Sequence, residues 1–284
     1  MDVELGWSEG LDPQGSGDRD VTESPTPAER VPADVRLLIS LATYNEAGNL
    51  EELIAAIRRV APTANILVID DDSPDGTGEI AERLRRDDPR IEVLHRPGKQ
   101  GLGTAVMAGM RHAIEGKYDY FLNLDADFSH PPRYIPQLVA GMERYDVMIG
   151  SRYVEGGGIA GDQFDWKRKL MSGGINWYAR TTLGLTARDT SGSFRCYRVS
   201  KLAAIDFARI YSRGYSFMEE ILFRCQQVGC RIGETPIVFE NRRAGVSKIN
   251  PKEALKALVI MGRIGLHRLL GRERSRASGA SVRR

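Results

Sequence analysis

The stretch "FLNLDADFSHPP", residues 121–132, runs from an apolar segment of strand length into a short polar turn and two prolines. The apolar segment ends at Asp125 and Asp127, which a single alanine separates, and Pro131 suits the first turn of a following helix. A continuous apolar run of this length is typical of a strand that is buried on both faces of a parallel sheet. In such sheets ligands bind beyond the carboxyl ends of the strands, which is where the two aspartates stand.

The segments on both sides of this stretch repeat the same alternation. Apolar runs typical of buried strands occupy residues 35–42, 65–70, 90–95, 118–124 and 145–150, and segments with helical spacing occupy 49–61, 76–86, 103–116 and 132–143. The second half is less regular, with predicted helices at 167–184 and 216–229 and predicted strands at 192–200 and 231–240. The pattern predicts an α/β fold, a mainly parallel sheet flanked by helices, in one domain of residues 34–250.

The two ends of the 284-residue chain differ in charge from this domain. Residues 1–33 hold eight acids and two bases, a net of −6, and few large apolar side chains, so we predict a disordered acidic tail. Residues 251–284 hold nine bases and two acids, a net of +7, and we predict a basic amphipathic helix at 251–270 and a basic disordered tail at 271–284. The formal net charge of +2 does not favour nucleic acid as a partner.

Composition also limits the compartment and the chemistry. Three cysteines without a CxxC pair fit neither a disulfide framework nor a zinc ribbon. The N-terminus lacks the apolar core of a signal peptide, and no stretch reaches the roughly 18 uncharged apolar residues of a spanning helix, so we expect no membrane crossing by this chain alone. The four histidines have no metal-ligand spacing, and we predict a catalytic role for none of them.

Asp125 and Asp127 fit two interpretations. Side by side without a cation, two carboxylates repel each other and one tends to stay protonated. A divalent ion removes the repulsion, and Mg²⁺ typically binds one or two carboxylates together with substrate phosphates and water. The alternative is a turn that caps the next helix, because aspartate suits that role as well. Taken alone the pair favours the turn, whereas the polar residues after the neighbouring strands favour the metal.

Those neighbouring strand ends are unusually polar. The run at 65–70 leads into "DDDSPDGTG", whose carboxylates can accept hydrogen bonds from a base or a ribose. The run at 90–95 leads into "GKQGLGTA", which is no Walker A loop because Lys99 precedes the glycines, although backbone amides at such a helix start can approach a nucleotide. Arginines and lysines in "GSRYVEGGG", "WKRKLMS" and "RRAGVSK" are suited to bind phosphate.

The predicted helix at 251–270 carries Lys252, Lys256, Arg263 and His267 on one face at helical spacing. A basic amphipathic helix can lie in a membrane interface, where anionic lipid attracts it. The alternative is a helix that docks on the domain and keeps a solvated basic face. The sequence leaves both interpretations open.

Together the motifs resemble the polyprenol-phosphate (dolichyl-phosphate) mannosyltransferases, which are inverting family-2 glycosyltransferases with a GT-A fold. The resemblance covers about residues 36–250 and rests on motifs in the family's order: "ATYNE", "IDDDSPDGT", "GKQGLGTA", "DADFSHPP", "GSRYVEGGG", "KRKLMS", "SGSFRCYR" and "RRAGVSK". It implies a Rossmann-like GT-A domain that transfers mannose from GDP-mannose to polyprenyl phosphate with inversion. It also implies a peripheral location at the cytoplasmic face of a membrane.

The resemblance further implies roles for individual residues. Around the nucleotide sugar it places Thr43, Tyr44, Asn45, Glu46, Asp71, Lys99, Gly101, Asp125, Arg242 and Lys248. It assigns Mg²⁺ or Mn²⁺ to Asp125, Asp127 and Ser129, and the acceptor phosphate to Arg152, Arg168 and Ser172. Catalysis would rest on Asp125, Asp127, Arg152 and Arg168, and Glu220 matches an acceptor-side carboxylate of the family.

The sequence departs from the family's pattern at a few positions. Ala42 stands where the family usually has Pro, Phe128 where Leu is usual, and Met218–Glu219 where a Gln–Met pair is common. None of these changes removes a charged site residue. Some family members carry C-terminal transmembrane helices and this chain shows none, which suggests a membrane-anchoring partner protein or an interfacial helix.

Other functions stay open. A polyprenyl-phosphate glycosyltransferase that uses UDP-glucose or another nucleotide sugar would share the fold, since base and sugar selectivity depend on the shape of the pocket. A non-catalytic nucleotide-binding subunit of a membrane complex would not need the aspartate pair and the arginines. A nucleotidyltransferase would need a glycine-rich lysine loop after the first strand, where "ATYNEAGN" stands.

Overall fold

The computed structural model describes residues 30–160, 166–240 and 251–270, with the side chains of 166–172 and 251–256 excepted. Its first half alternates strand and helix as the sequence predicts. The elements are β1 (Leu37–Thr43), α1 (Leu50–Val60), β2 (Asn65–Asp70), α2 (Thr77–Asp87), β3 (Ile91–His95), α3 (Leu102–Glu115), β4 (Tyr120–Asp125), the 3-10 turn η2 (Pro132–Tyr134), α4 (Ile135–Gly141) and β5 (Val147–Ser151).

The second half is more irregular. It consists of β6 (Gly158–Ile159), α5 (Trp166–Leu183), β7 (Arg195–Arg198), α6 (Val199–Leu202), the 3-10 turn η3 (Phe207–Arg209), α7 (Phe217–Gln227), β8 (Ile232–Pro236), β9 (Val238–Phe239) and α8 (Pro251–Leu269). Short β6 and β9 pair with each other in a separate two-stranded sheet. The single strand predicted at 231–240 is thus two strands, β8 and β9.

The main sheet has the strand order β3-β2-β1-β4-β7-β5-β8. Neighbours pair in parallel except at β7, which runs antiparallel to both β4 and β5. The mainly parallel sheet is therefore confirmed. The reversed β7 has a consequence for function, because the end at which the chain enters β7 lies at the same edge as the ends at which it leaves β4 and β5.

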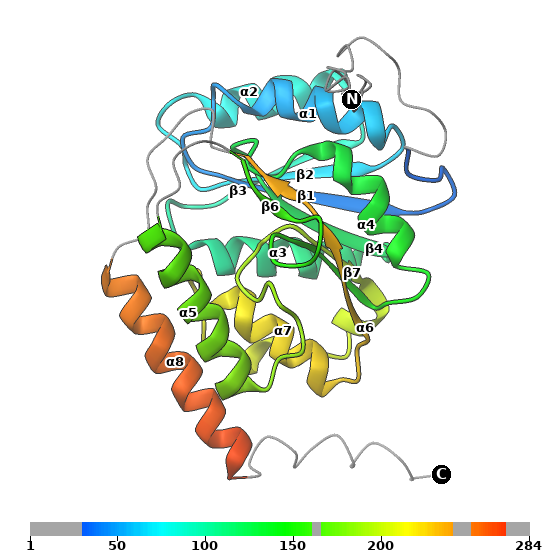
Figure 1. The fold of residues 1–284 in the computed structure, drawn as a ribbon. Coiled ribbons are helices and arrows are strands. Elements are labelled where there is room, and N and C mark those ends of the chain that lie inside the picture. The colour runs from blue at the N-terminus through cyan, green and yellow to red at the C-terminus, as the bar shows by residue number, and fades with distance from the viewer. Residues whose placement is uncertain (1–29, 161–165, 241–250, 271–284) are drawn as a thin grey trace, which may run out of the picture.

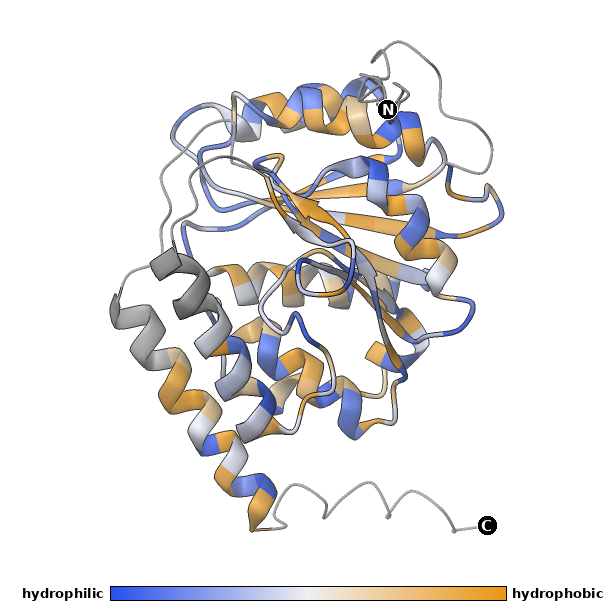
Figure 2. Ribbon diagram, in the orientation of Figure 1, coloured by the Kyte–Doolittle hydropathy of each residue, from blue (hydrophilic) through white to orange (hydrophobic). Residues whose placement is uncertain are grey.

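Helices cover both faces of this sheet (Figure 1). Alternate residues of each strand point to opposite faces, so Ile39 and Leu41 of β1 pack in the core under α1, α2 and α4, whereas Leu38 packs in the core on the side of α3 and α7. Strands β1 and β2 are correspondingly apolar over most of their length, as Figure 2 shows. Ligands of such a three-layer fold are confined to the polar edge beyond the strand ends.

Helix α1 illustrates why these segments are helical. Leu50, Leu53, Ile54 and Ile57 form its buried face at helical spacing, with acidic residues in its first turn and basic residues in its last, as the helix dipole favours. Val31 is also buried, and its backbone N–H donates to the carbonyl of Val60 at 2.8 Å. Among the described residues, packing therefore includes Val31, a few residues before the expected boundary at residue 34, and residues 1–29 of the predicted tail lie outside the described part.

Helices α5 and α8 lie side by side at one end of the molecule (Figure 1). Met261 and Ile264 of α8 are buried, and Gly265 lies so close to Thr182 of α5 that an added Cβ would be 2.4 Å from its Cγ2. The helix therefore docks on the domain by one face. No helix within the described residues combines the length and the apolar character needed to cross a bilayer.

Candidate active site

The loop after β4 carries the aspartate pair. Ala42 of β1 pairs with Asp125 in register, so the pair stands at the carboxyl edge of the sheet. The side chain of Asp125 is 28% exposed, whereas Asp127 is 5% exposed. Asp127 accepts hydrogen bonds through Oδ1 from the backbone N–H and the Oγ of Ser129, at 3.0 and 2.5 Å. Phe128 between them has a φ of +63°, a left-handed conformation that is rare for a large side chain.

His130 supports this loop from beneath, a role that the sequence does not predict. It is buried between the rings of Phe194 and Phe239, at centroid distances of 5.3 and 5.2 Å. Burial lowers its pKa, and its Nδ1 accepts the backbone N–H of Asp125 at 3.4 Å. The imidazole is therefore neutral, and the 3.6 Å contact between Nδ1 and the Asp125 carboxylate is no ion pair.

The aspartate pair suits a divalent cation that a substrate shares. Within the described residues, no group of three or more His, Cys, Asp or Glu is arranged to hold a metal. Two carboxylates are nevertheless the usual protein share for Mg²⁺, whose remaining ligands are phosphate oxygens and water. Ser129 is fully buried and its hydroxyl donates to Asp127, an arrangement that favours orienting that carboxylate over the predicted direct contact with the metal.

The loops after β1 and β2 are bound to each other by side-chain hydrogen bonds. Thr43, predicted near the nucleotide, is buried and donates through Oγ1 to Asp70 Oδ1 at 3.0 Å. Asn45, in a left-handed conformation, donates its backbone N–H to Ser73 Oγ, and that of Glu46 donates to Thr77 Oγ1.

Asp75 closes this pair of loops. It accepts from the backbone N–H of Ala47 at 3.0 Å and from the Thr77 hydroxyl at 2.5 Å. Partial burial opposes its ionisation, but these hydrogen bonds outweigh that effect and lower its pKa. The predicted nucleotide residues from 43 to 46 are thus held on a loop that two strands support.

The structure brings predicted residues of the first three strand ends together. The Lys99 ammonium lies over the ring of Tyr44, 4.6 Å from its centroid. Asp71 is buried and forms an ion pair with Arg96, whose Nε donates to Asp71 Oδ1 at 2.6 Å. The other oxygen of Asp71, Oδ2, accepts the backbone N–H of Gln100 at 3.3 Å. Asp71 therefore joins the loop after β3 to β2, and Arg96 is a residue that the sequence analysis does not identify.

Gly101 precedes α3 with a φ of +99°. A Cβ at this position would lie 2.6 Å from the carbonyl oxygen of Arg213, and one at Gly103 would lie 2.5 Å from Cβ of Phe217. These glycines let the start of α3 contact the turn before α7. The packing explains both glycines, and the predicted contact of Gly101 with the nucleotide stays a prediction.

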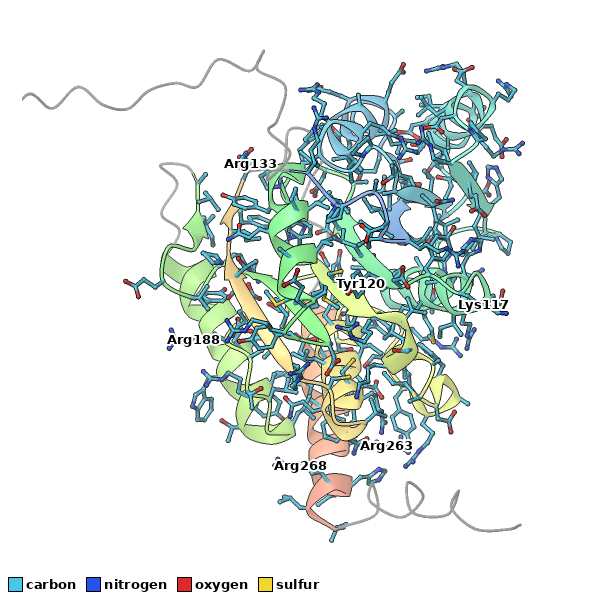
Figure 3. All side chains as sticks on the ribbon, turned by 90° about the vertical axis from the view of Figure 1, so that its right-hand side faces the viewer. Lys117, Tyr120, Arg133, Arg188, Arg263 and Arg268 are labelled. Carbon is cyan, nitrogen blue, oxygen red and sulfur yellow. The ribbon has the colours of Figure 1, made fainter. Side chains whose placement is uncertain are left out.

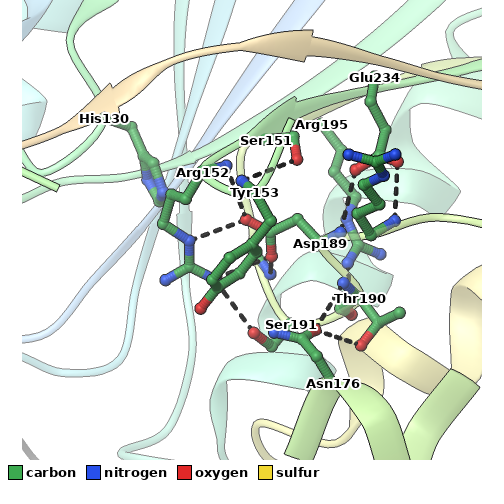
Figure 4. Close-up of polar contacts among 12 residues, drawn as sticks. His130, Ser151, Arg152, Tyr153, Asn176, Asp189, Thr190, Ser191, Arg195 and Glu234 are labelled. Atoms are coloured by element: carbon green, nitrogen blue, oxygen red, sulfur yellow. Dashed lines mark hydrogen bonds and ion pairs between the residues drawn. The ribbon is translucent and has the colours of Figure 1, made fainter. Parts of the chain in front are cut away.

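Arg152 follows β5 and is held by Asp189, a fully buried carboxylate just before β7 (Figure 4). Nε and one terminal nitrogen of Arg152 donate to the two Asp189 oxygens, each at 2.8 Å. Burial opposes charge on both groups, but their mutual hydrogen bonds outweigh it, so the pKa of Arg152 is raised and that of Asp189 is lowered. A second donation, from the same terminal nitrogen to Ser191 Oγ at 3.1 Å, fixes the guanidinium plane.

A network of buried groups fixes the segment 188–193 that carries Asp189 and Ser191. Glu234 accepts the backbone N–H groups of Arg188 and Asp189, and Asn176 Oδ1 accepts both N–H and hydroxyl of Thr190 (Figure 4). Fully buried Arg195 donates to the carbonyl of Thr190 at 2.6 Å and to that of Met218 at 2.6 Å. We call residues 189–193 the bridging segment.

The bridging segment reaches the aspartate pair as well. Ser193 Oγ donates to Asp125 Oδ1 at 2.7 Å, and Asn123 donates its side-chain amide to the Ser193 carbonyl at 3.1 Å. One segment of five residues thus contacts Asp125, the last residue of β4, and Arg152, the first residue after β5. The sequence motif "SGSFRCYR" includes residues 191–193, but no role is predicted for Asp189, Ser191 or Ser193, although the polar run "RDTSGS" at the start of a predicted strand is a signal of a possible ligand contact.

Four predicted residues cannot be judged by their contacts. Arg168 and Ser172 belong to α5, in the part whose side chains are outside the described set, and Arg242 and Lys248 lie outside the described residues. The chain before Arg242 does lie at the site. Glu240 donates its backbone N–H to the carbonyl of Ser129 at 3.1 Å, and the Phe239 ring stacks on the Arg152 guanidinium at 5.4 Å.

The structure shows a structural role for Glu220, and its predicted acceptor-side role stays a prediction. Glu220 is fully buried, and its carboxylate accepts the backbone N–H groups of Tyr211 and Ser212 and pairs with Arg224 at 3.1 Å. With its oxygens used in this way, it stabilises the turn before α7. Its neighbour Glu219 is also buried.

Sequence comparison agrees with the geometry. The sequence profile of glycosyl transferase family 2 matches residues 39–205. An undecaprenyl-phosphate mannosyltransferase from Micrococcus luteus is 40% identical over 232 residues, which are 82% of this chain and 95% of that protein. A polyprenol monophosphomannose synthase from Mycolicibacterium smegmatis is 35% identical over 263 residues, 92% of this chain and 96% of that one.

Solved structures are similar in fold. Glucosyl-3-phosphoglycerate synthase from Mycobacterium tuberculosis, in complex with Mn²⁺, UDP and glucosyl-3-phosphoglycerate, has a TM-score of 0.53 at 19% identity and covers 88% of this chain and 84% of its own. S. aureus TarS in complex with UDP-GlcNAc has a TM-score of 0.53 at 16% identity, covering 82% and 67%. These likenesses confirm the GT-A Rossmann-like architecture. With its profile match over more than half of its length and two full-length relatives, the chain belongs to glycosyl transferase family 2.

Proposed function

We propose that this glycosyltransferase transfers mannose from GDP-mannose to polyprenyl phosphate with inversion, giving polyprenyl-phosphate β-mannose and GDP. The observation that carries the proposal is the bridging segment, which contacts Asp125 through Ser193 and Arg152 through Asp189 and Ser191. Asp125, which is suited to bind a metal ion with a diphosphate, and Arg152, which is suited to bind a phosphate, are thereby fixed by the same segment of the chain. The choice of polyprenyl phosphate as the acceptor and of mannose as the transferred sugar is supported by the names of the two relatives.

On the donor side, Asp125 and Asp127 would hold Mg²⁺ or Mn²⁺. The ion, when bound, neutralises charge on the diphosphate and so stabilises the leaving GDP. Ser129 and Ser193 orient the two carboxylates, and neutral His130 supports the backbone of Asp125 without adding charge. The paired loops after β1 and β2, together with Tyr44 and Lys99, provide the nucleotide surface.

On the acceptor side, Arg152 is the described cation suited to receive a phosphate, with Arg168 and Ser172 of α5 as the predicted additions. The Asp189 carboxylate occupies Nε and one terminal nitrogen, and among the described residues the other terminal nitrogen has no hydrogen bond. A guanidinium fixed in this way presents its remaining donors in one orientation, which suits alignment of an attacking oxygen.

The reaction needs no general base on the protein. The second pKa of a phosphate monoester is ~6, so the acceptor is already largely a dianion at neutral pH. A phosphate oxygen forms the bond to the anomeric carbon while the bond from that carbon to the GDP oxygen breaks. Attack from the face opposite GDP turns α-mannose into β-mannose, and the residues of the site contribute alignment and electrostatic stabilisation.

We further propose that α8 and α5 place this site at a lipid surface. Apolar side chains on the outer side of the helix pair stay exposed, among them Trp177 at 69% and Leu269 at 81%, with Val259 and Leu266. Exposed Arg263 and Arg268 belong to the same helix α8 (Figure 3), and their guanidinium groups lie against Tyr211 and Thr182 at the border of this surface. An apolar surface with interspersed cations suits anionic lipid, and a polyprenyl acceptor stays in the membrane. The sequence alternatives of docking on the domain or on lipid are compatible, because different faces of α8 serve each.

The proposal is tested by a transfer assay with GDP-[¹⁴C]mannose and purified polyprenyl phosphate in detergent, with Mg²⁺ or Mn²⁺. We expect a labelled lipid from which mild acid releases labelled mannose. We expect no product when a chelator removes the divalent metal. Parallel reactions with UDP-glucose test the other donor, and thermal shifts with GDP against UDP test the base. Binding of nucleotide without transfer to any lipid phosphate would favour the non-catalytic subunit, and a requirement for added membrane protein would point to an anchoring partner.

A further inference from the structure

The proposed mechanism does not use one buried carboxyl group, that of Glu219, whose preceding residue Met218 accepts a hydrogen bond from Arg195 at 2.6 Å. Glu219, in the first turn of α7, is 4% exposed, and its Oε2 is buried without a hydrogen-bond partner among the described residues. An ionised carboxylate in such a place lacks the hydrogen bonds that normally compensate for its removal from water. Burial therefore raises the pKa of Glu219 to about 7.

The charges that reach Glu219 belong to the acceptor side of the site. They come from Arg195 of β7, Asp189 of the bridging segment and Arg152 after β5. On α7 itself, the charges of Glu220 and Arg224 are already paired with each other. Helix α3 contacts the start of α7 through uncharged Gly103, which lies against Phe217. Glu219 thus belongs to a group of two arginines and two carboxylates, which we call the arginine cluster.

The pairing within the arginine cluster is incomplete. Asp189 gives both oxygens to Arg152 and also accepts the backbone N–H of Gly192 at 2.9 Å. Arg195 is fully buried, its two terminal nitrogens donate to the backbone carbonyls of Met218 and Thr190, and its buried Nε has no hydrogen-bond partner among the described residues. Within the described arginine cluster, the carboxyl group that has no arginine partner of its own is that of Glu219. Its protonation state decides whether the cluster has a net charge of +1 or 0.

We propose that Glu219 is a positioning residue that adjusts the charge of the arginine cluster, so that a proton on Glu219 strengthens the hold of Arg152 on a phosphate dianion and loss of that proton weakens it. The choice of a phosphate dianion as the ligand of Arg152 rests on the proposed function. The coupling is reciprocal, so a bound dianion draws a proton onto Glu219. Transfer turns the acceptor dianion into a phosphodiester monoanion, which favours ionisation of Glu219 and release of product. The proton remains on Glu219 during bond formation.

The first test uses sulfate, a tetrahedral dianion that does not titrate between pH 6 and 8, at constant ionic strength. Sulfate affinity is measured by thermal shift for the wild type, Glu219→Gln and Glu219→Met, with Arg152→Gln to subtract binding elsewhere. We expect affinity of the wild type to fall about tenfold from pH 6 to pH 8, while both neutral variants keep the pH 6 affinity throughout. Exposed Glu115→Gln should follow the wild type.

The second test measures KM for polyprenyl phosphate. Because the acceptor itself titrates at ~6, the readout is the ratio of wild-type KM to Glu219→Gln KM at each pH. We expect a ratio near one at pH 6 and about ten at pH 8, with the KM for GDP-mannose unchanged. Parallel pH profiles of wild type and variants, in sulfate binding or in KM, would overturn the proposal, as would a wild type that binds no sulfate at Arg152. A wild type that binds sulfate as expected but transfers no mannose would refute the proposed function alone.

Discussion

Ser193 and Asp125 stand 68 residues apart in the chain and are joined by a hydrogen bond of 2.7 Å from Ser193 Oγ to Asp125 Oδ1. Two residues earlier, Ser191 donates no such bond to the aspartate but accepts one from Arg152 at 3.1 Å. The two serines of the bridging segment therefore serve opposite sides of the proposed reaction. This difference makes them a matched pair for substitution.

Ser193→Ala should affect the donor side and Ser191→Ala the acceptor side. Loss of one hydrogen bond to a charged group corresponds to roughly ten- to a hundredfold in activity. For Ser193→Ala we expect the metal concentration that gives half-maximal transfer to rise by that factor, with KM for polyprenyl phosphate unchanged. Ser191→Ala should show the reverse. The same defect in both variants would contradict the division of the bridging segment.

Asp127→Asn should abolish transfer, because the amide keeps the shape of the side chain but offers no negative charge to a cation. We expect a loss of at least about a hundredfold, measured at saturating Mg²⁺ and Mn²⁺. Exposed Asp87→Asn at the end of α2 is the matched control and should retain activity. An unchanged melting temperature of Asp127→Asn would show that the fold is intact, and full activity of that variant would refute the metal assignment.

Arg168→Ala should weaken use of the lipid phosphate more than binding of the nucleotide. Removing one guanidinium from a phosphate site should raise KM for polyprenyl phosphate about tenfold. The thermal shift with GDP should remain that of the wild type. Arg180→Ala, which removes an exposed arginine from the last turn of the same helix, provides the control. Equal losses of acceptor use and GDP binding would argue against the acceptor role.

Val259→Glu and Leu266→Glu should reduce binding to vesicles that contain anionic lipid, because each places a carboxylate on the exposed apolar side of α8. About tenfold weaker cosedimentation is expected, with normal transfer to a short, water-soluble prenyl phosphate. Gln137→Glu adds the same charge on α4, on the opposite face of the sheet, and should bind vesicles normally. Unchanged binding of both α8 variants would exclude this surface as the lipid contact.

Asp146 should make the protein sensitive to acid. Its carboxylate accepts from Arg198 Nε at 3.1 Å and from the backbone N–H of Arg231 at 2.9 Å. Partial burial opposes ionisation, but these bonds prevail and lower the pKa of Asp146. A lowered pKa in the folded state adds stability above the unfolded-state value, which is lost as the pH falls through the folded-state value. Asp146→Asn should reduce the melting temperature at pH 7 and flatten its fall below pH ~4, whereas Asp87→Asn should not.

Much of the fold is legible from the sequence because its information is local. Runs such as residues 35–42 and 65–70 are apolar throughout, the helices between them have an apolar face, and parallel strands place their ends at one edge. The aspartate pair and the loops with Tyr44 and Asp71 could be gathered at one site on that basis. The predicted strand near 192–200 exists, but its position between β4 and β5 depends on pairing that no local pattern encodes.

The site residues that could not be predicted from the sequence depend on the direction of that strand, β7. Asp189 and Ser193 are polar residues in a loop, and only the reversed direction of β7 brings them to the edge where Asp125 and Arg152 stand. Glu220 and Glu219 show a second limit. They are adjacent acids in one helix, yet only the folded chain determines that Glu220 pairs with Arg224 and backbone N–H groups while Glu219 belongs to the arginine cluster.

The place of β7 in the strand order also divides the molecule mechanically. Strands β4 and β5 do not pair, so the block β3-β2-β1-β4 and the block β5-β8 are joined within the main sheet only by the four residues of β7. Asp125 belongs to one block and Arg152 follows a strand of the other. If the pairing of β7 with β4 and β5 opened, Asp125 and Arg152 would separate while the strands within each block could stay paired. Amide exchange at Cys196 and Tyr197 is therefore the local signal that reports whether both substrates can be aligned at once.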